Sequence, residues 1–205
     1  YKYIGIRHLV TQGCIFDQEL LYDKFPNQYL PYDFETYFSN PTTFEMVTTN
    51  CLTGTAMYLT DKQNKQRTLD IVRASSSLPF VSKIVEVDGI PMLDGGIVDS
   101  IPVMRAIETG HDTNVVVMTR NFGFRATGKA NKIPYFIYKK YPRLRVALSR
   151  RLQVYNNQLQ LTEDLEREGK IICIRPEKPL EVGRIEKDTL KLEQLYEEGF
   201  KLGER

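Results

Sequence analysis

Asp94 has the sequence setting that most favours chemistry in this chain. It follows the apolar residues Met92 and Leu93 and precedes two glycines, Gly95 and Gly96. This arrangement puts a carboxylate on a tight turn, with no neighbouring side chains to block a substrate or a second stretch of backbone. Such a carboxylate acts as a general base when a hydroxyl lies within hydrogen-bond reach. The alternative is a plain turn, which composition alone favours because Asp-Gly turns are common.

Two linked motifs resemble those of patatin-like lipid acyl hydrolases. Residues 94–96, Asp-Gly-Gly, followed by Pro102, look like the family's Asp-Gly-Gly/Ala motif. Residues 73–79, Arg-Ala-Ser-Ser-Ser-Leu-Pro, look like the Ala-Ser-x-x-x-Pro segment that precedes this motif in the family. Residues 48–54 and 115–121 are also similar to the family. The whole chain resembles the second part of bacterial patatin-like phospholipases, including their C-terminal helical extension.

The resemblance implies a serine-aspartate dyad that acts on a lipid substrate, with Asp94 as the base and with no metal or cofactor. In the family, a serine within Gly-x-Ser-x-Gly attacks the ester, and an upstream glycine-rich loop holds the oxyanion. Gly95 and Gly96 would shape the turn, while Ser75 and Pro79 would line the site. No serine of this chain has glycine two residues away on both sides. We therefore expect the nucleophile to lie in a missing N-terminal part, and the chain alone to be inactive.

Other interpretations stay open. The chain could be a catalytically silent module that keeps the fold and binds a lipid or a partner. His111 follows Asp94 in the order that α/β-hydrolases use for their triad, although its place after Gly110 at a predicted helix end is typical of capping. The position of Asp99 near a predicted helix start also indicates a capping role at the helix end. Two histidines and three widely spaced cysteines give little support to a zinc site.

A strongly basic stretch covers residues 120–151, with ten basic residues and no acidic one in a chain of formal charge +2. Docking to an anionic membrane surface is one interpretation, because basic residues there contribute about 1 kcal/mol each. A solvated helix face that pairs with acidic residues such as Glu163 is the other. Nucleic-acid binding is disfavoured, because no RNA- or DNA-binding motif accompanies the charge. The proposed contacts are Arg120, Arg125, Lys139, Lys140, Arg143, Arg145, Arg150 and Arg151, and Lys129 and Lys132 complete the basic set.

Local signals predict the elements that position Asp94. β-prone residues predict strands at 44–49 and 55–60, and the Asp88-Gly89 pair predicts a tight turn between two short strands. Short helices and loops are expected over residues 1–40. Residues whose side chains commonly cap helices predict where two helices begin, and a proline or a glycine predicts where each helix ends. These helices run from Thr68 to before Pro79 and from Ser100 to Gly110.

Two unbroken apolar runs, residues 115–118 and 171–174, are typical of parallel strands covered on both faces. Helices are expected at 133–168 between them, and an amphipathic helix that stops at Gly203 follows. We predict an α/β fold with a mostly parallel sheet flanked by helices, patatin-like and incomplete at the N-terminus. Residues 1–125 would be the C-terminal part of the catalytic domain. Residues 126–205 would be a helical extension with one further strand, packed on the same domain.

The amino-acid composition limits the classes of protein to which the chain can belong. The 205 residues are 41% apolar and 26% charged, which suits a soluble globular domain and excludes wholesale disorder. No stretch approaches the ~18 consecutive apolar residues of a membrane-spanning helix. Three widely spaced cysteines indicate reduced thiols rather than a disulfide framework. We therefore expect a cytoplasmic protein that contacts the inner membrane face peripherally.

Overall fold

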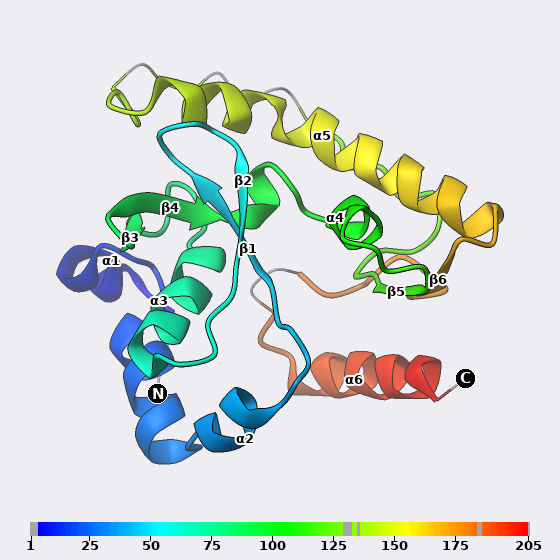
Figure 1. The fold of residues 1–205 in the computed structure, drawn as a ribbon, viewed down its shortest axis with the longest axis horizontal. Coiled ribbons are helices and arrows are strands. Elements are labelled where there is room, and N and C mark those ends of the chain that lie inside the picture. The colour runs from blue at the N-terminus through cyan, green and yellow to red at the C-terminus, as the bar shows by residue number, and fades with distance from the viewer. Residues whose placement is uncertain (1–3, 129–132, 135, 184–185, 205) are drawn as a thin grey trace. The chain divides into compact units, whose positions relative to one another are not determined.

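The structure is a computed structural model that describes residues 4–128, 133–134, 136–183 and 186–204. Helices and strands are mixed along the chain (Figure 1), which confirms the α/β class. The chain forms two compact units, one of residues 1–100 with 129–151 and one of residues 101–128 with 152–205. The predicted boundary between residues 125 and 126 stays a prediction.

The first unit contains a four-stranded sheet in the order β2-β1-β4-β3. In this sheet β1 spans Met46–Asn50, β2 Ala56–Leu59, β3 Val85–Val87 and β4 Ile90–Asp94. All four strands lie close to their predicted positions, and each neighbouring pair is antiparallel. β4 lies beside β1, so the Asp-Gly-Gly turn leaves the sheet from an inner strand.

The expected mostly parallel sheet is therefore not found in this unit, and short connections explain the antiparallel pairing of β1 with β2 and of β3 with β4. The amide of Asn50 donates to the Thr55 carbonyl at 3.0 Å, which closes a short turn between β1 and β2. Asp88 and Gly89 both have positive φ, 53° and 76°, and form the predicted tight turn between β3 and β4. Connections this short join antiparallel neighbours, because a parallel pair needs a crossover of about a dozen or more residues.

Short helices precede the sheet, as residues 1–40 predict. α1 spans Ile6–Gln12, a π-helix (η1) spans Leu20–Tyr29, and α2 spans Phe34–Ser39. The next helix, α3, spans Lys65–Ser75 and ends before Pro79, as predicted.

The predicted start of α3 at Thr68 is wrong. The Asn64 side chain caps α3 by accepting from the Arg67 amide at 3.0 Å. The Thr68 hydroxyl instead donates to the Asn64 carbonyl at 2.9 Å from inside the first turn.

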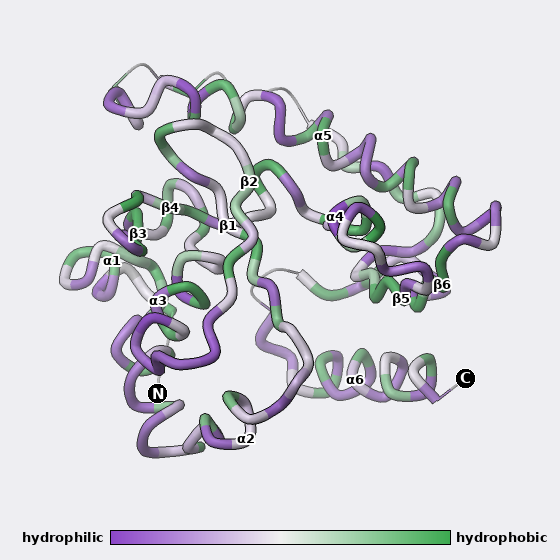
Figure 2. The backbone as a smooth tube through the Cα atoms, viewed as in Figure 1, coloured by the Kyte–Doolittle hydropathy of each residue, from purple (hydrophilic) through white to green (hydrophobic). Residues whose placement is uncertain are grey.

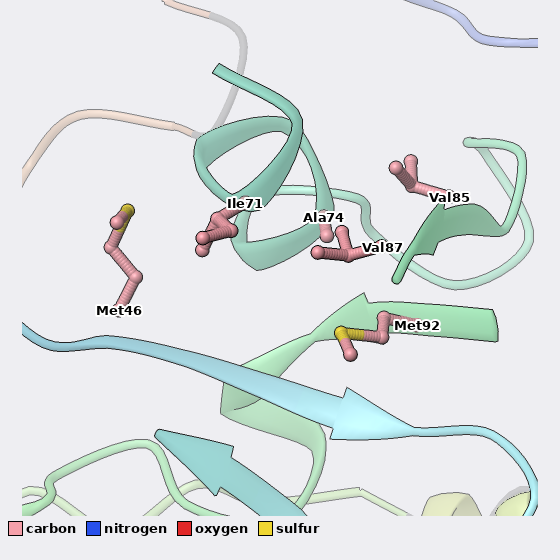
Figure 3. Close-up of a cluster of buried hydrophobic side chains, with 6 residues drawn as sticks. All are labelled: Met46, Ile71, Ala74, Val85, Val87 and Met92. Carbon is pink, nitrogen blue, oxygen red and sulfur yellow. The ribbon is translucent and has the colours of Figure 1, made fainter. Parts of the chain in front are cut away.

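Two hydrophobic clusters cover opposite faces of the sheet, because successive side chains of a strand point to opposite sides. Met92 of β4 belongs to the cluster on the α3 side (Figure 3), whose buried members are Met46, Ile71, Ala74, Val85, Val87 and Met92. The next residue, Leu93, packs with Leu144 and Leu148 from the start of α5, which spans Pro142–Arg167. β4 is thus buried on both sides up to Asp94.

The second unit contains a parallel pair, β5 (Asn114–Val117) and β6 (Ile171–Ile174). The two predicted parallel strands are therefore confirmed. One face packs on α4 (Val103–Glu108) and the C-terminal part of α5. The other face is exposed at Val115, Val117 and Ile172. The prediction that both faces are covered is thus wrong for the described residues.

Of the two remaining predicted helices, one begins differently from the prediction and the other is confirmed. α4 has no side-chain cap, and the Ser100 hydroxyl donates instead to the Gly96 carbonyl at 2.9 Å, so the predicted Ser100 cap is wrong. The predicted C-terminal helix is confirmed as α6, Thr189–Gly203, along which hydrophobic and hydrophilic positions alternate (Figure 2). Among the described helices, including the long α5, none is both long enough and apolar enough to span a membrane.

Candidate active site around Asp94

Asp94 ends β4, and three hydrogen bonds fix its position. Its amide donates to the Ser77 carbonyl at 2.9 Å, and its carbonyl accepts from the Thr49 hydroxyl at 2.8 Å. Its side-chain Oδ1 accepts from the Gly96 amide at 2.6 Å. The backbone and one carboxylate oxygen are thus held in place by neighbouring residues of the same unit.

The second carboxylate oxygen of Asp94 keeps its hydrogen-bonding capacity. No hydrogen bond or ion pair from the described part of the chain reaches Oδ2. Burial raises the pKa of the Asp94 carboxyl, while the Gly96 N–H bond and the positive charge of Arg151 offset part of that rise. A half-buried carboxylate with a raised pKa and a free oxygen is suited to accept a proton.

Arg151 is placed by the same turn. Its Nε donates to the Gly96 carbonyl at 2.9 Å, and this carbonyl also accepts from the Ser100 hydroxyl. The side chain comes from α5, more than fifty residues further along the chain. The guanidinium of Arg151 therefore supplies a fixed positive charge near the Asp94 carboxylate.

Neighbouring atoms leave little room for a side chain at either glycine of the turn. A Cβ added to Gly95 would lie 2.4 Å from the Val47 carbonyl oxygen on β1. A Cβ added to Gly96 would lie 2.9 Å from Oδ1 of Asp94. The predicted role of Gly95 and Gly96 in shaping the turn thus has a steric basis, because any side chain there would collide with β1 or with the carboxylate.

Ser75 and Pro79 lie in the segment that supports the turn. The Ser75 hydroxyl donates at 2.8 Å to the carbonyl of Val47, the group that Gly95 approaches. Pro79 is buried two residues after Ser77, whose carbonyl binds the Asp94 amide. The Ser75 hydroxyl is therefore engaged within the protein and supports β1. Lining of the site by these two residues stays a prediction.

Thr49, Ser77 and Arg151 are the site residues that sequence reasoning missed in these roles. Thr49 reaches Asp94 because β1 pairs with β4, with Thr48 opposite Asp94. No local pattern reveals the register of two strands more than forty residues apart. Asp99, predicted as a helix-end charge, accepts a hydrogen bond from the Tyr58 hydroxyl at 2.6 Å.

The structure separates the basic stretch into two groups. Some cations are held internally: Arg125 pairs with buried Glu163 at 2.7 Å, and Arg145 donates to the Ile133 carbonyl at 3.0 Å. Arg120 lies 4.8 Å from the centre of the Phe124 ring. The cations with exposed side chains are Lys139, Lys140, Arg143 and Arg150, and Lys129 and Lys132 lie outside the described residues.

The remaining candidates have ordinary contacts. His111 is exposed, and its Nδ1 lies 3.1 Å from both the Thr109 hydroxyl and the Ala106 carbonyl at the end of α4. This is the helix-end position predicted for it. Among the described residues, no three His, Cys, Asp or Glu side chains are grouped to hold a metal ion.

Two family models match parts of the chain. The family model for patatin-like phospholipases matches residues 1–107, just over half of the chain and including the whole Asp94 turn. The chain therefore belongs to the patatin-like phospholipase family. A second family model, described as a domain of unknown function (DUF6363), matches residues 141–205.

A match to one bacterial protein adds detail. The chain is 50% identical over 56 residues to the "Uncharacterized protein YjjU" of Escherichia coli strain K12. This match covers 27% of the chain and 16% of that protein's length.

Proposed function

We propose that Asp94 is the general base and orienting group of a serine-aspartate dyad that hydrolyses acyl esters of lipids. One observation carries this proposal: Oδ1 is tied to the Gly96 amide, while Oδ2 is free of partners in the described chain. The first contact orients the carboxylate, and the second oxygen is available to a serine hydroxyl. Membership of the family supports a lipid ester as the substrate.

The proposed mechanism needs a serine from outside these 205 residues, because none of the serines present has the Gly-x-Ser-x-Gly context. Oδ2 of Asp94 accepts the hydroxyl proton as the serine oxygen attacks the ester carbonyl carbon. The alcohol then leaves with that proton, and an acyl-serine remains. Water then attacks the acyl-serine while Asp94 accepts one of its protons, and Asp94 returns this proton to the serine oxygen as the bond to the acyl group breaks and the fatty acid is released. Without the serine, this chain should show little or no hydrolase activity.

A fluorophosphonate probe tests the dyad in the parent protein that carries this chain. Asp94→Asn should slow labelling by about 10²-fold or more, because the amide cannot accept the serine proton. Asp99→Asn is the matched control, since its side chain can still accept from the Tyr58 hydroxyl at 2.6 Å. Labelling that is unchanged in Asp94→Asn would count against the dyad and favour a catalytically silent module.

We also propose that the exposed cations of the basic stretch contact an anionic membrane surface from the cytoplasmic side. The supporting observation is that Lys139, Lys140, Arg143 and Arg150 have exposed side chains. Replacing all four with glutamine should reduce co-sedimentation with anionic vesicles at low salt. Equal binding to neutral and anionic vesicles would contradict this contact. Binding to nucleic acid without binding to anionic vesicles would show that the exposed cations serve a different partner.

A further inference from the structure

Exposed aromatic and aliphatic side chains gather in residues 25–44 of the first unit. Their exposed fractions range from 44% at Phe25 to 73% at Leu30. Single exposed apolar residues are common, whereas a connected set on one segment indicates an interaction surface. We name this set the aromatic patch, and its exposed members are Phe25, Tyr29, Leu30, Tyr32 and Phe44.

Ring contacts join the aromatic members of the patch in two sets. Phe25 and Tyr29 of η1 meet edge to face at 5.9 Å between ring centres. Tyr32 and Phe44 each contact the ring of Tyr37 on α2, at 5.9 Å and 6.4 Å. The patch therefore extends along the chain from η1 through α2 to the segment that enters β1 (Figure 1).

The body of the unit holds the patch through Tyr37. The Tyr37 hydroxyl donates to the Asp61 carbonyl at 2.9 Å. Lys62 donates to the carbonyls of Tyr37 and Asn40, at 3.0 Å and 2.9 Å, and its ammonium lies 4.7 Å from the Tyr37 ring centre. Because these contacts are made within the unit, the rings of Tyr32 and Phe44 beside Tyr37 need little ordering before they bind.

The charge of the patch is close to balanced. Residues 25–44 contain two charged side chains, Asp33 and Glu35. Asp33 accepts from the Thr36 amide and hydroxyl, which lowers its pKa and keeps it ionised. Lys62 and Lys65 place ammonium groups over rings of α2, at 4.7 Å and 4.9 Å. A balanced surface has no attraction for nucleic acid, which requires an excess of cations.

We infer that the aromatic patch docks on a zwitterionic phospholipid surface, with Tyr29 and Leu30 entering the headgroup region. Tyrosine rings and lysine side chains are favoured at this depth, because each has an apolar body and a polar end. Balanced charge matches a headgroup of zero net charge. The inference rests on the proposed function for its choice of lipid, but binding to lipid requires no catalysis and is measured separately.

Tryptophan fluorescence tests the docking directly, because the chain contains no tryptophan. Leu30→Trp places a probe on the patch. Phe136→Trp places one at an exposed site in the basic stretch, and Phe200→Trp places one at an exposed site on α6. With phosphatidylcholine vesicles, the Leu30→Trp emission should shift to the blue and be quenched by brominated lipid, while the other two stay unchanged. Quenching at Phe136→Trp or Phe200→Trp without quenching at Leu30→Trp would overturn the proposal.

The triple variant Tyr29→Ser, Leu30→Ser and Tyr32→Ser gives an independent measurement. Its affinity for phosphatidylcholine vesicles should fall by at least about tenfold, because three side chains no longer leave water. Its thermal unfolding should match the wild type, since the replaced side chains are exposed. Vesicle binding equal to wild type would overturn the proposal, as would sedimentation velocity showing that the patch joins two copies of the chain. Hydrolysis of a soluble short-chain ester by the parent protein tests the dyad separately, so failure of one proposal does not count as failure of the other.

Discussion

Replacing Gly95 with alanine tests whether backbone packing against β1 positions the Asp94 turn. The added Cβ would lie 2.4 Å from the Val47 carbonyl oxygen and 2.6 Å from the carbonyl carbon. That carbonyl cannot easily retreat, because Val47 pairs with Tyr58 of β2 and accepts the Ser75 hydroxyl at 2.8 Å. The strain must therefore appear as displaced strands or bent bond angles.

The size of the effect follows from these contacts. Overpacking a core costs about 1–3 kcal/mol, and a 15° change in the N–Cα–C angle costs about 4 kcal/mol. We expect Gly95→Ala to lower the free energy of unfolding by about 3 kcal/mol. In a chain of this size, such a loss lowers the melting temperature by about 6–12 °C.

Gly96→Ala is the matched control for this measurement. Its Cβ would lie 2.9 Å from Oδ1 of Asp94, the end of a side chain that can rotate away. We expect a loss below about 1 kcal/mol in stability, together with reduced fluorophosphonate labelling of the parent protein because the carboxylate is displaced. Urea and thermal unfolding followed by circular dichroism compare the two variants. A melting temperature for Gly95→Ala equal to that of Gly96→Ala would refute the packing argument.

Three further predictions concern titratable groups. Because burial raises the pKa of Asp94, its ionised form destabilises the fold, so Asp94→Asn should melt higher than wild type at about pH 8 and equally at about pH 3. Arg125→Met removes the partner of Glu163, whose side chain is 6% exposed, and should lower stability by about 2–3 kcal/mol in urea titrations. This loss should shrink in acid, because Arg125 lowers the pKa of Glu163 and the stability of the pair is lost as pH falls through it. Cys51 is fully buried with its pKa raised to about 12, so a thiol reagent at about pH 8 should modify it only after unfolding in urea.

The sequence predicts elements well where the signal is local. Asp88 and Gly89 define a turn by their own backbone preferences, and Pro79 limits α3 whatever packs against it. The predicted caps at Thr68 and Ser100 are wrong, because several residues near each helix start can cap it and tertiary contacts select among them. The mostly parallel sheet is not confirmed, because short connections make β1-β2 and β3-β4 antiparallel pairs, and only β5 and β6 form a parallel pair among the described strands.

The sequence predicts only the central residues of the candidate site. Asp94 was found from its own motif, and the glycines follow from the same turn. The hydroxyl of Thr49 and the carbonyl of Ser77 reach Asp94 through strand pairing and chain packing, which leave no pattern in the local sequence. Arg151 was grouped with the other basic residues by charge, although its contact with the Gly96 carbonyl gives it a different role.

The exposed face of β5 and β6 affects how this polypeptide behaves at high concentration. Each of these strands has one strand partner among the residues described, so each also has an edge that no other described strand covers. Val117 of β5 is 75% exposed beside such an edge. Edges of this kind recruit extended segments from other molecules. Solubility should therefore set the practical upper limit on studies of the isolated chain, and dilute samples will be the ones that report on single molecules.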